Sequence, residues 1–277
     1  MSDVPRQEVW DQRTASSAPA RFPRAPGSRW RHALPALIIL AGLGAWQLIL
    51  PLAHVPGYLL PTPSQIATDM KADWPVLAPA VLVTLSEVLL GFVISVAAGV
   101  GLAVLLHLIP AVRRAVYPLL IGSQTVPIIV LAPILVILFG YGIVPKLVIV
   151  ALVCFFPVVV SGVDGLRSVD GELISVMRTL DASRWAIFRR VEFPTALPSI
   201  FSGMRIAATF AAIGAVFGEW SGSNQGLGYV MLAATPNLLT ARIFAAIVLL
   251  TVIALALFGA VSLAERIFVP WASRGKG

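Results

Sequence analysis

Residues 80–106 read AVLVTLSEVLLGFVISVAAGVGLAVLL. This stretch contains one charged residue, Glu87, and is longer than the roughly 20 apolar residues that a helix needs to cross a bilayer. A helix can cross lipid because it satisfies its own backbone hydrogen bonds. Gly91, Ser95 and Gly99 recur at four-residue spacing, which favours close helix packing on that face. We therefore predict a transmembrane helix here.

The composition of the 277-residue chain indicates that lipid surrounds much of its surface. Hydrophobic residues make up 58% of the chain and charged residues 12%, whereas soluble domains contain about 25% charged residues. The net charge of +7 and the pI near 10.3 would also suit a nucleic-acid binder. However, the basic residues are scattered between apolar blocks and form no stripe interleaved with aromatic residues. We therefore expect no nucleic-acid partner and interpret the charge as a membrane-orientation signal.

Six apolar blocks are long enough to span a membrane. They cover residues 33–52, 80–106, 115–139, 143–162, 197–218 and 243–268. The sequence therefore predicts an all-α integral membrane protein with about six transmembrane helices and contact with lipid along them. Pro127 and Pro133 interrupt the helical pattern of the block 115–139, so we expect a kink there.

Lysine and arginine residues are distributed unequally between the two sides that six spans would create. Only Lys71, Lys146 and Arg242, of 20 basic residues, fall on one side. The positive-inside rule makes the other side the cytoplasm, which then holds both termini. Residues 1–32 are predicted to form a disordered, basic cytoplasmic tail. The apolar run that follows is predicted to be an uncleaved helix, since a secretory signal would begin differently.

The segment between the fourth and fifth blocks, residues 161–199, carries helix signals of its own. It reads SGVDGLRSVDGELISVMRTLDASRWAIFRRVEFPTALPS. Asp170 is placed to cap a helix that runs to about Thr179. Ser183 is placed to cap a second short helix that ends before Pro194. We therefore predict two short helices on the cytoplasmic surface.

The first of these helices is predicted to be amphipathic. Its apolar residues recur at the spacing of one helix face, namely Leu173, Val176, Met177 and Leu180. Periodicity leaves two interpretations open. The helix pair could lie on the lipid surface, with Arg189 and Arg190 near anionic headgroups, or it could offer its apolar face to another protein.

This segment resembles the EAA loop of ABC importer permeases. In that pattern E-A-A is followed by three residues, a glycine, nine residues and I-x-L-P. Anchoring the proline on Pro194 places Asp181 at the glycine, and the family's glutamate and glycine are both absent here. Aspartate tolerates a positive φ better than most residues, so it suits the glycine position. The run LDASRWAIFRRVEFPTALP (180–198) is similar to that of the nitrate, sulfonate and taurine branch.

The resemblance covers residues 76–267. It includes TLSEVLLGF (84–92), PIIVLAP (127–133), SGMRIAA (202–208) and GEW (218–220) followed by GLGY (226–229). The chain thus resembles a type I ABC importer permease, with a permease domain over 33–277 and a coupling loop at 161–199. The resemblance implies that the loop docks on an ATPase through Ser175, Val176, Met177, Leu180, Asp181, Ala182 and Pro194.

The same resemblance implies the partners and the location. We expect a homodimer of this chain, two copies of an ABC ATPase subunit and an extracytoplasmic solute-binding protein, in a bacterial inner membrane. The permease would not be an enzyme, because ATP hydrolysis would belong to the ATPase. The chain has no G-x-x-x-x-G-K-[ST] phosphate loop, and we expect no cofactor.

Carboxylates inside apolar blocks are costly and suggest function. Glu87 and Glu219 are such residues, and we predict that they line the translocation pathway with Gln124, Thr125 and Trp220. The simpler alternative is that both carboxylates are solvated at headgroup level. No metal site is expected, since the three histidines show no ligand spacing and the single cysteine lies in an apolar run.

Two questions remain open at this level. An ion-coupled secondary transporter is the alternative class, although such proteins usually carry more intramembrane charge. The solute is expected to be small and polar. The motifs TLSEVLLGF and GEW favour the aminopyrimidine branch, with sulfonate, taurine, nitrate and riboflavin as alternatives.

Overall fold

The computed structural model describes residues 29–271, and the chain divides into two compact units after Ile49. The first unit holds helix α2, Arg29–Leu52, except for the last three residues of that helix. Within it, Leu34–Leu52 is apolar and long enough to cross a membrane. The helix begins at Arg29, a few residues before the expected start at residue 33. Residues 1–28, which hold most of the predicted basic tail, lie outside the described part of the chain.

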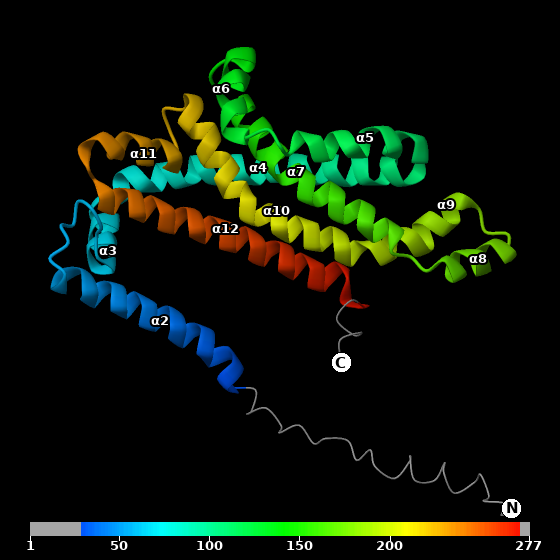
Figure 1. Cartoon of the computed structure of the whole chain (residues 1–277), viewed down its shortest axis with the longest axis horizontal. Coiled ribbons are helices and arrows are strands. Elements are labelled where there is room, and N and C mark those ends of the chain that lie inside the picture. The colour runs from blue at the N-terminus through cyan, green and yellow to red at the C-terminus, as the bar shows by residue number, and fades with distance from the viewer. Residues whose placement is uncertain (1–28, 272–277) are drawn as a thin grey trace, which may run out of the picture. The chain divides into compact units, whose positions relative to one another are not determined.

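The second unit is built from helices throughout its described residues (Figure 1). Its elements are α3 (Pro63–Ala72), α4 (Trp74–Leu108), α5 (Pro110–Ser123), α6 (Ile128–Phe139), α7 (Ile143–Arg167), α8 (Gly171–Thr179), α9 (Arg184–Ile187), the π-turn η1 (Phe188–Glu192), α10 (Phe193–Gly222), α11 (Leu227–Ala234), η2 (Thr235–Asn237) and α12 (Thr240–Phe268). The prediction of an all-α membrane protein is confirmed.

The number of spans agrees with the sequence. Five helical segments among the described residues are long and apolar enough to cross a membrane, and a sixth is added if the bent pair α5 and α6 counts as one span. The two members of that pair meet at 101°. The break follows from Pro127, which has no N–H to donate and disfavours helical geometry in the residue before it. The predicted block 115–139 is therefore a broken helix.

Helix α7 forms the centre of the second unit, packed against α4 on one side and α10 on the other. The small residues of α4 permit this approach. A Cβ on Gly91 would lie 2.6 Å from the Val150 side chain, and one on Gly99 would lie 2.9 Å from Val158. The predicted small-residue face of α4 is therefore the face that packs on α7.

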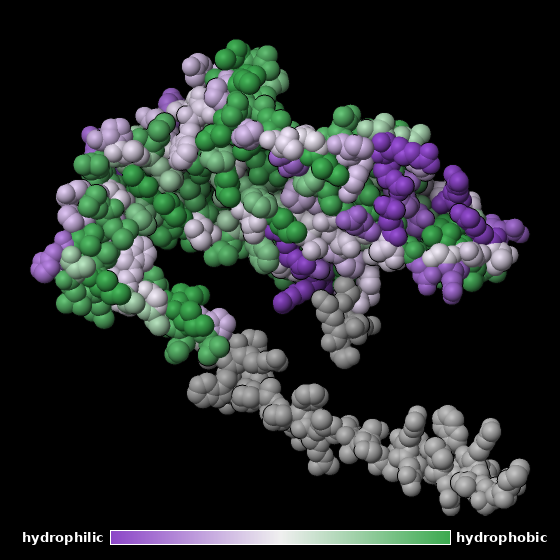
Figure 2. Space-filling view, viewed as in Figure 1, coloured by the Kyte–Doolittle hydropathy of each residue, from purple (hydrophilic) through white to green (hydrophobic). Residues whose placement is uncertain are grey.

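The second unit has two distinct ends. Figure 1 places α3 and α11 at one end, here called the α11 end, and α8 and α9 at the other, here called the loop end. In Figure 2 hydrophilic side chains gather at the loop end, while hydrophobic side chains cover α6 and much of the middle. At the α11 end, Arg242 donates two hydrogen bonds to Asp73, at 2.6 and 2.8 Å, and so ties the start of α12 to the start of α4.

Candidate functional site

Helix α8 at the loop end is capped at both ends by its own sequence. Asp170 accepts a hydrogen bond from the Glu172 N–H at 2.9 Å, as the sequence predicts. At the other end Ala182 N donates to Met177 O and Asp181 N donates to Arg178 O. This pair of bonds is a Schellman motif, which requires a left-handed residue at its turn. That residue is Asp181, with φ +56°, so the conformation expected from its glycine-like position is present.

The apolar face of α8 lies uncovered at the loop end. Leu173 is 47% exposed, Val176 is 54% exposed and Leu180 is 73% exposed. Met177 is partly buried, and no residue of α8 is fully buried. Ser175 lies away from this face, and its hydroxyl donates to Gly171 O within the helix. An apolar face at the hydrophilic end of the unit is suited to burial against a partner.

The second helix of the loop differs from the sequence prediction. Ser183 caps it as expected, accepting from the Ala186 N–H at 3.2 Å. However, the helix does not end before Pro194. It continues through the π-turn η1 into α10, where Pro194 occupies the first turn. The π-turn inserts one extra residue directly before Pro194, whose ring and missing N–H would otherwise disrupt a regular helix interior.

A link between the loop and α4 was not found from the sequence. His107 Nε2, in the last turn of α4, lies 2.9 Å from Glu192 Oε2 in η1. The Phe188 ring lies beside the same histidine, at 6.3 Å between ring centroids, and stacks on Trp185 at 5.4 Å. The two bonded residues are 85 positions apart, and no local pattern relates residues at that separation.

A buried polar cluster occupies the α11 end. Glu87 of α4 is 1% exposed and accepts a hydrogen bond at 2.6 Å from Lys146 of α7, which is 7% exposed. Lys146 also donates to Ser223 Oγ at 2.8 Å, just after α10. The positive-inside rule placed Lys146 on the side of the membrane that holds few basic residues, but it did not reveal that this lysine is buried. The signal for this pair was available, because an ionisable residue inside a span usually has a charged partner.

The second carboxylate of the cluster holds α11 in place. Glu219 is fully buried and accepts from Thr84 Oγ1 at 2.6 Å. Its other oxygen accepts from the N–H groups of Gly228 and Tyr229 at 2.5 and 3.3 Å, in the first turn of α11. A carboxylate there satisfies unpaired helix donors. Because both carboxylates are buried, the alternative of solvation at headgroup level does not hold.

Trp220 and Gly226 complete the surroundings of Glu219. The Trp220 indole donates to Gly228 O at 3.0 Å, so this side chain also braces α11. Gly226 has φ +106°, and a Cβ at this position would overlap the Glu219 carboxyl group. The Glu87 and Glu219 carboxyl groups also lie close enough to interact. The structure thus brings together three of the five predicted pathway residues.

The other two, Gln124 and Thr125, lie at the break between α5 and α6. Gln124 lines a cavity of about 610 Å³ that is bounded by α5, α6, α7 and α10. Thr125 does not line it, and its hydroxyl instead donates to Gly122 O at 2.8 Å. Most of the lining is apolar, with Gln124 and Ser123 as its polar side chains.

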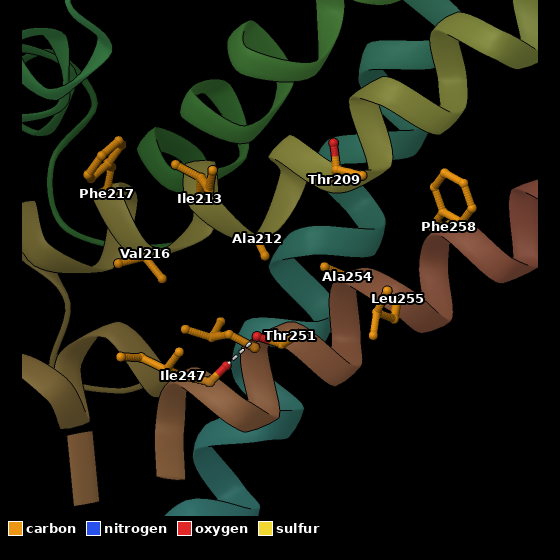
Figure 3. A pocket seen from close by; sticks show the side chains of 11 residues that line it. Thr209, Ala212, Ile213, Val216, Phe217, Ile247, Thr251, Ala254, Leu255 and Phe258 are labelled. Carbon is orange, nitrogen blue, oxygen red and sulfur yellow. Dashed lines mark hydrogen bonds between the residues drawn. The ribbon is translucent and has the colours of Figure 1, made fainter. Parts of the chain in front are cut away.

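A cavity of about 510 Å³ between α10 and α12 offers different chemistry. Figure 3 shows that its side chains come from these two helices. The polar members, Thr209 and Thr251, donate to Ile206 O and Ile247 O of their own helices. Its walls are therefore suited to hydrocarbon and provide little to bind a polar solute.

A smaller cavity of about 440 Å³ lies at the α11 end beside the polar cluster. It is lined by Tyr141, Gly142, Lys146, Gly222, Ser223 and Asn224. Most of these residues carry hydrogen-bonding side chains, in contrast to the cavity between α10 and α12.

Comparison with known proteins places these features in context. The family described as the inner membrane component of binding-protein-dependent transport systems matches residues 91–274. The formylaminopyrimidine transport permease protein ThiX of Halalkalibacterium halodurans is 36% identical over 86% of this chain and 95% of its own length. The riboflavin transport system permease protein RibX of Chloroflexus aurantiacus is 34% identical over 86% and 89%.

More distant similarities extend the set. The putative aliphatic sulfonates transport permease protein SsuC of Bacillus subtilis is 30% identical, over 88% of each chain. An inward-facing structure of the MetNI methionine ABC transporter aligns with a TM-score of 0.58 at 20% identity, over 70% of this chain and 96% of that one. At this identity the structural match supports the fold.

Proposed function

The chain belongs to the family of inner membrane components of binding-protein-dependent transport systems, and from this premise we propose which solute it carries and how it couples to its partners. It is a multi-pass permease subunit of an ABC importer in the inner membrane. Because the chain belongs to this family, the alternative function of an ion-coupled secondary transporter is set aside. The proposed solute is an aminopyrimidine, supported by 36% identity to a formylaminopyrimidine permease over nearly the whole of that relative.

Helix α8 is the proposed docking site for the ATPase. The observation that carries this proposal is its apolar face, exposed at Val176 and Leu180 and held by caps at both ends. A capped helix keeps its shape when force is applied, and an exposed apolar face gains free energy when a groove covers it. ATP hydrolysis then takes place on a separate subunit, with one copy bound to each permease chain.

The proposed orientation follows from charge. Arginines gather at the loop end of the described residues, among them Arg167, Arg178 and Arg184. The α11 end carries Lys71, Lys146 and Arg242. The positive-inside rule then makes the loop end cytoplasmic and the α11 end external. Both chain termini are cytoplasmic in this orientation, and the binding protein delivers solute at the α11 end.

A second copy of the chain is the proposed partner of α6. This helix rises from the unit in Figure 1. Ile137 is 82% exposed and Leu138 is 69% exposed. The cavity that contains Gln124 lies at the base of the same helix. A homodimer formed on this side would enclose the translocation pathway between two copies of α6 and α7.

Reconstitution tests this proposal. The tagged chain is expressed with its ATPase and binding protein, purified, and placed in proteoliposomes containing ATP. We expect the ATPase to copurify, two permease copies by native mass spectrometry, and uptake of radiolabelled formylaminopyrimidine. Uptake of taurine or riboflavin in its place would reject the proposed solute. A single permease copy paired with a different permease chain would reject the homodimer.

A further inference from the structure

We propose that Lys146 and the cavity beside it form a solute site. The site binds a neutral polar molecule whose hydrogen-bond acceptors receive the free N–H of Lys146. This inference rests on the proposed import function, because it names the class of solute that enters at the α11 end. The site is the 440 Å³ cavity lined by Lys146, Ser223, Asn224 and Tyr141.

Lys146 retains one hydrogen-bond donor that no described residue of the protein uses. An ammonium group has three N–H donors. One binds Glu87 Oε1 at 2.6 Å and a second binds Ser223 Oγ at 2.8 Å. Among the described residues these are the two partners of Nζ, and Lys146 lines the cavity. The remaining donor is therefore available to a molecule in the cavity.

The protein holds this ammonium in a fixed position. Its stem passes over Gly218, where a Cβ would lie 3.1 Å from the Lys146 Cα and 3.2 Å from its Cβ. Ser223 is held in turn, since its hydroxyl donates to Gln225 O at 2.6 Å and accepts from Gln225 N at 3.1 Å. A donor that is already oriented loses little entropy when it binds a solute.

The charge of the cluster decides which class of solute fits. Lys146 contributes one positive charge, while Glu87 and Glu219 contribute one negative charge each when ionised. The cluster is then negative overall, and a proton on either carboxyl group would make it neutral. While at least one carboxyl group is ionised, the site carries no net positive charge. An anion such as a sulfonate therefore gains no net attraction, whereas a neutral molecule can accept the free N–H without this repulsion.

The rest of the lining suits a flat, neutral molecule. Tyr141 supplies an aromatic ring that is 83% exposed. A heteroaromatic ring with nitrogen acceptors and a carbonyl group could accept from Lys146 and pack on Tyr141. This combination of contacts is the basis for assigning the class.

Protection of a single cysteine from labelling tests the site. The native Cys154 is buried, so Asn224→Cys introduces a reporter at the cavity, and Asn237→Cys provides a matched exposed reporter outside it. The reconstituted importer is labelled with a maleimide at pH 8. A concentration of formylaminopyrimidine ten times the Kd should slow labelling of the first reporter about tenfold, and leave the second unchanged. Taurine should protect neither.

Two variants test the role of Lys146 in the Asn224→Cys background. Lys146→Met with Glu87→Leu removes both members of the ion pair, which avoids leaving a buried charge unpaired. The protection midpoint should rise about tenfold or more, because a hydrogen bond from a charged donor is lost. Ser223→Ala removes the group that orients Nζ and should raise the midpoint less. It serves as the deciding variant if the double variant fails to retain its ATPase.

Several results would overturn the site. They are an unchanged midpoint in an assembled Lys146 variant, an absence of protection by any neutral solute, and equal protection by taurine. Failure of the proposed solute looks different. If formylaminopyrimidine is not taken up but riboflavin protects Asn224→Cys in a Lys146-dependent way, the site stands and the aminopyrimidine assignment falls.

Discussion

His107 Nε2 lies 2.9 Å from Glu192 Oε2 and joins the last turn of α4 to the π-turn η1 that follows α9. Helix α4 is continuous from Trp74 to Leu108. It therefore carries this junction at one end and Glu87 of the buried cluster about 30 Å away. A displacement of the loop would be passed to the α11 end through one rigid helix.

Breaking this junction should reduce coupling. His107→Leu removes the hydrogen bond, which contributes roughly 1–3 kcal/mol, and leaves Glu192 without its partner. We expect ATP hydrolysis to continue while fewer solute molecules enter per ATP. His107→Gln keeps a donor and should restore most of the ratio. The ratio is measured in proteoliposomes from ATP hydrolysed and radiolabel accumulated. Parallel loss of both activities in His107→Leu would indicate a purely structural role.

A charge on the apolar face of α8 should release the ATPase. In Met177→Asp or Val176→Asp, docking would bury an unpaired carboxylate, which costs several kcal/mol, or roughly a thousandfold in association. The permease itself should still insert and dimerise. Gly171→Asp is the matched control, since it adds the same charge on the opposite face, in open space and at the helix N-terminus. Retention of ATPase and uptake by Met177→Asp would refute the docking assignment.

The left-handed turn at Asp181 predicts opposite effects for two substitutions of this residue. Asp181→Gly should preserve uptake, because glycine adopts a positive φ without steric cost. Asp181→Val should disrupt the Schellman turn, because a β-branched residue is strongly disfavoured at φ +56°. Both variants are tested by measuring solute uptake and copurification of the ATPase. Equal behaviour of the two variants would show that the turn is not needed for docking.

Gly226→Ala should destabilise the α11 end. The added Cβ would overlap the Glu219 carboxyl group, at a residue with φ +106°. We expect a fall in Tm and loss of uptake, since Glu219 would have to release the N–H groups of Gly228 and Tyr229. Gly101→Ala provides the control, because nothing lies within 4 Å of its Cβ position. A Tm fall of the same size in both variants would argue against this packing.

Cysteine accessibility tests the orientation. Lys71→Cys, near the end of α3, should react with an impermeant maleimide added outside intact cells. Arg178→Cys, in α8, should react only after the membrane is opened. Both positions are exposed in the structure, so reactivity reports the side of the membrane. The reverse pattern would contradict the orientation and, with it, the placement of the ATPase.

Local features of this protein follow from the sequence alone. Apolar run length identified the spans, and the side chains of Asp170 and Ser183 marked two helix starts that the structure confirms. The glycine-like position of Asp181 predicted its left-handed backbone. These features depend on residues within one or two helical turns of each other. The interacting groups are therefore close together in the sequence, where a local pattern can reveal them.

The tertiary structure alone decided which buried polar groups meet. Glu87 and Lys146 are 59 positions apart, and Thr84 and Glu219 are 135 positions apart. In lipid the outer faces of helices are as apolar as their contacts, so hydropathy does not reveal which face packs on which neighbour. Close packing of α4 on α7 at Gly91 and Gly99 sets that arrangement. It encloses Glu87 and leaves Lys146 at the edge of a cavity, a distinction that arises only when three helices occupy fixed positions.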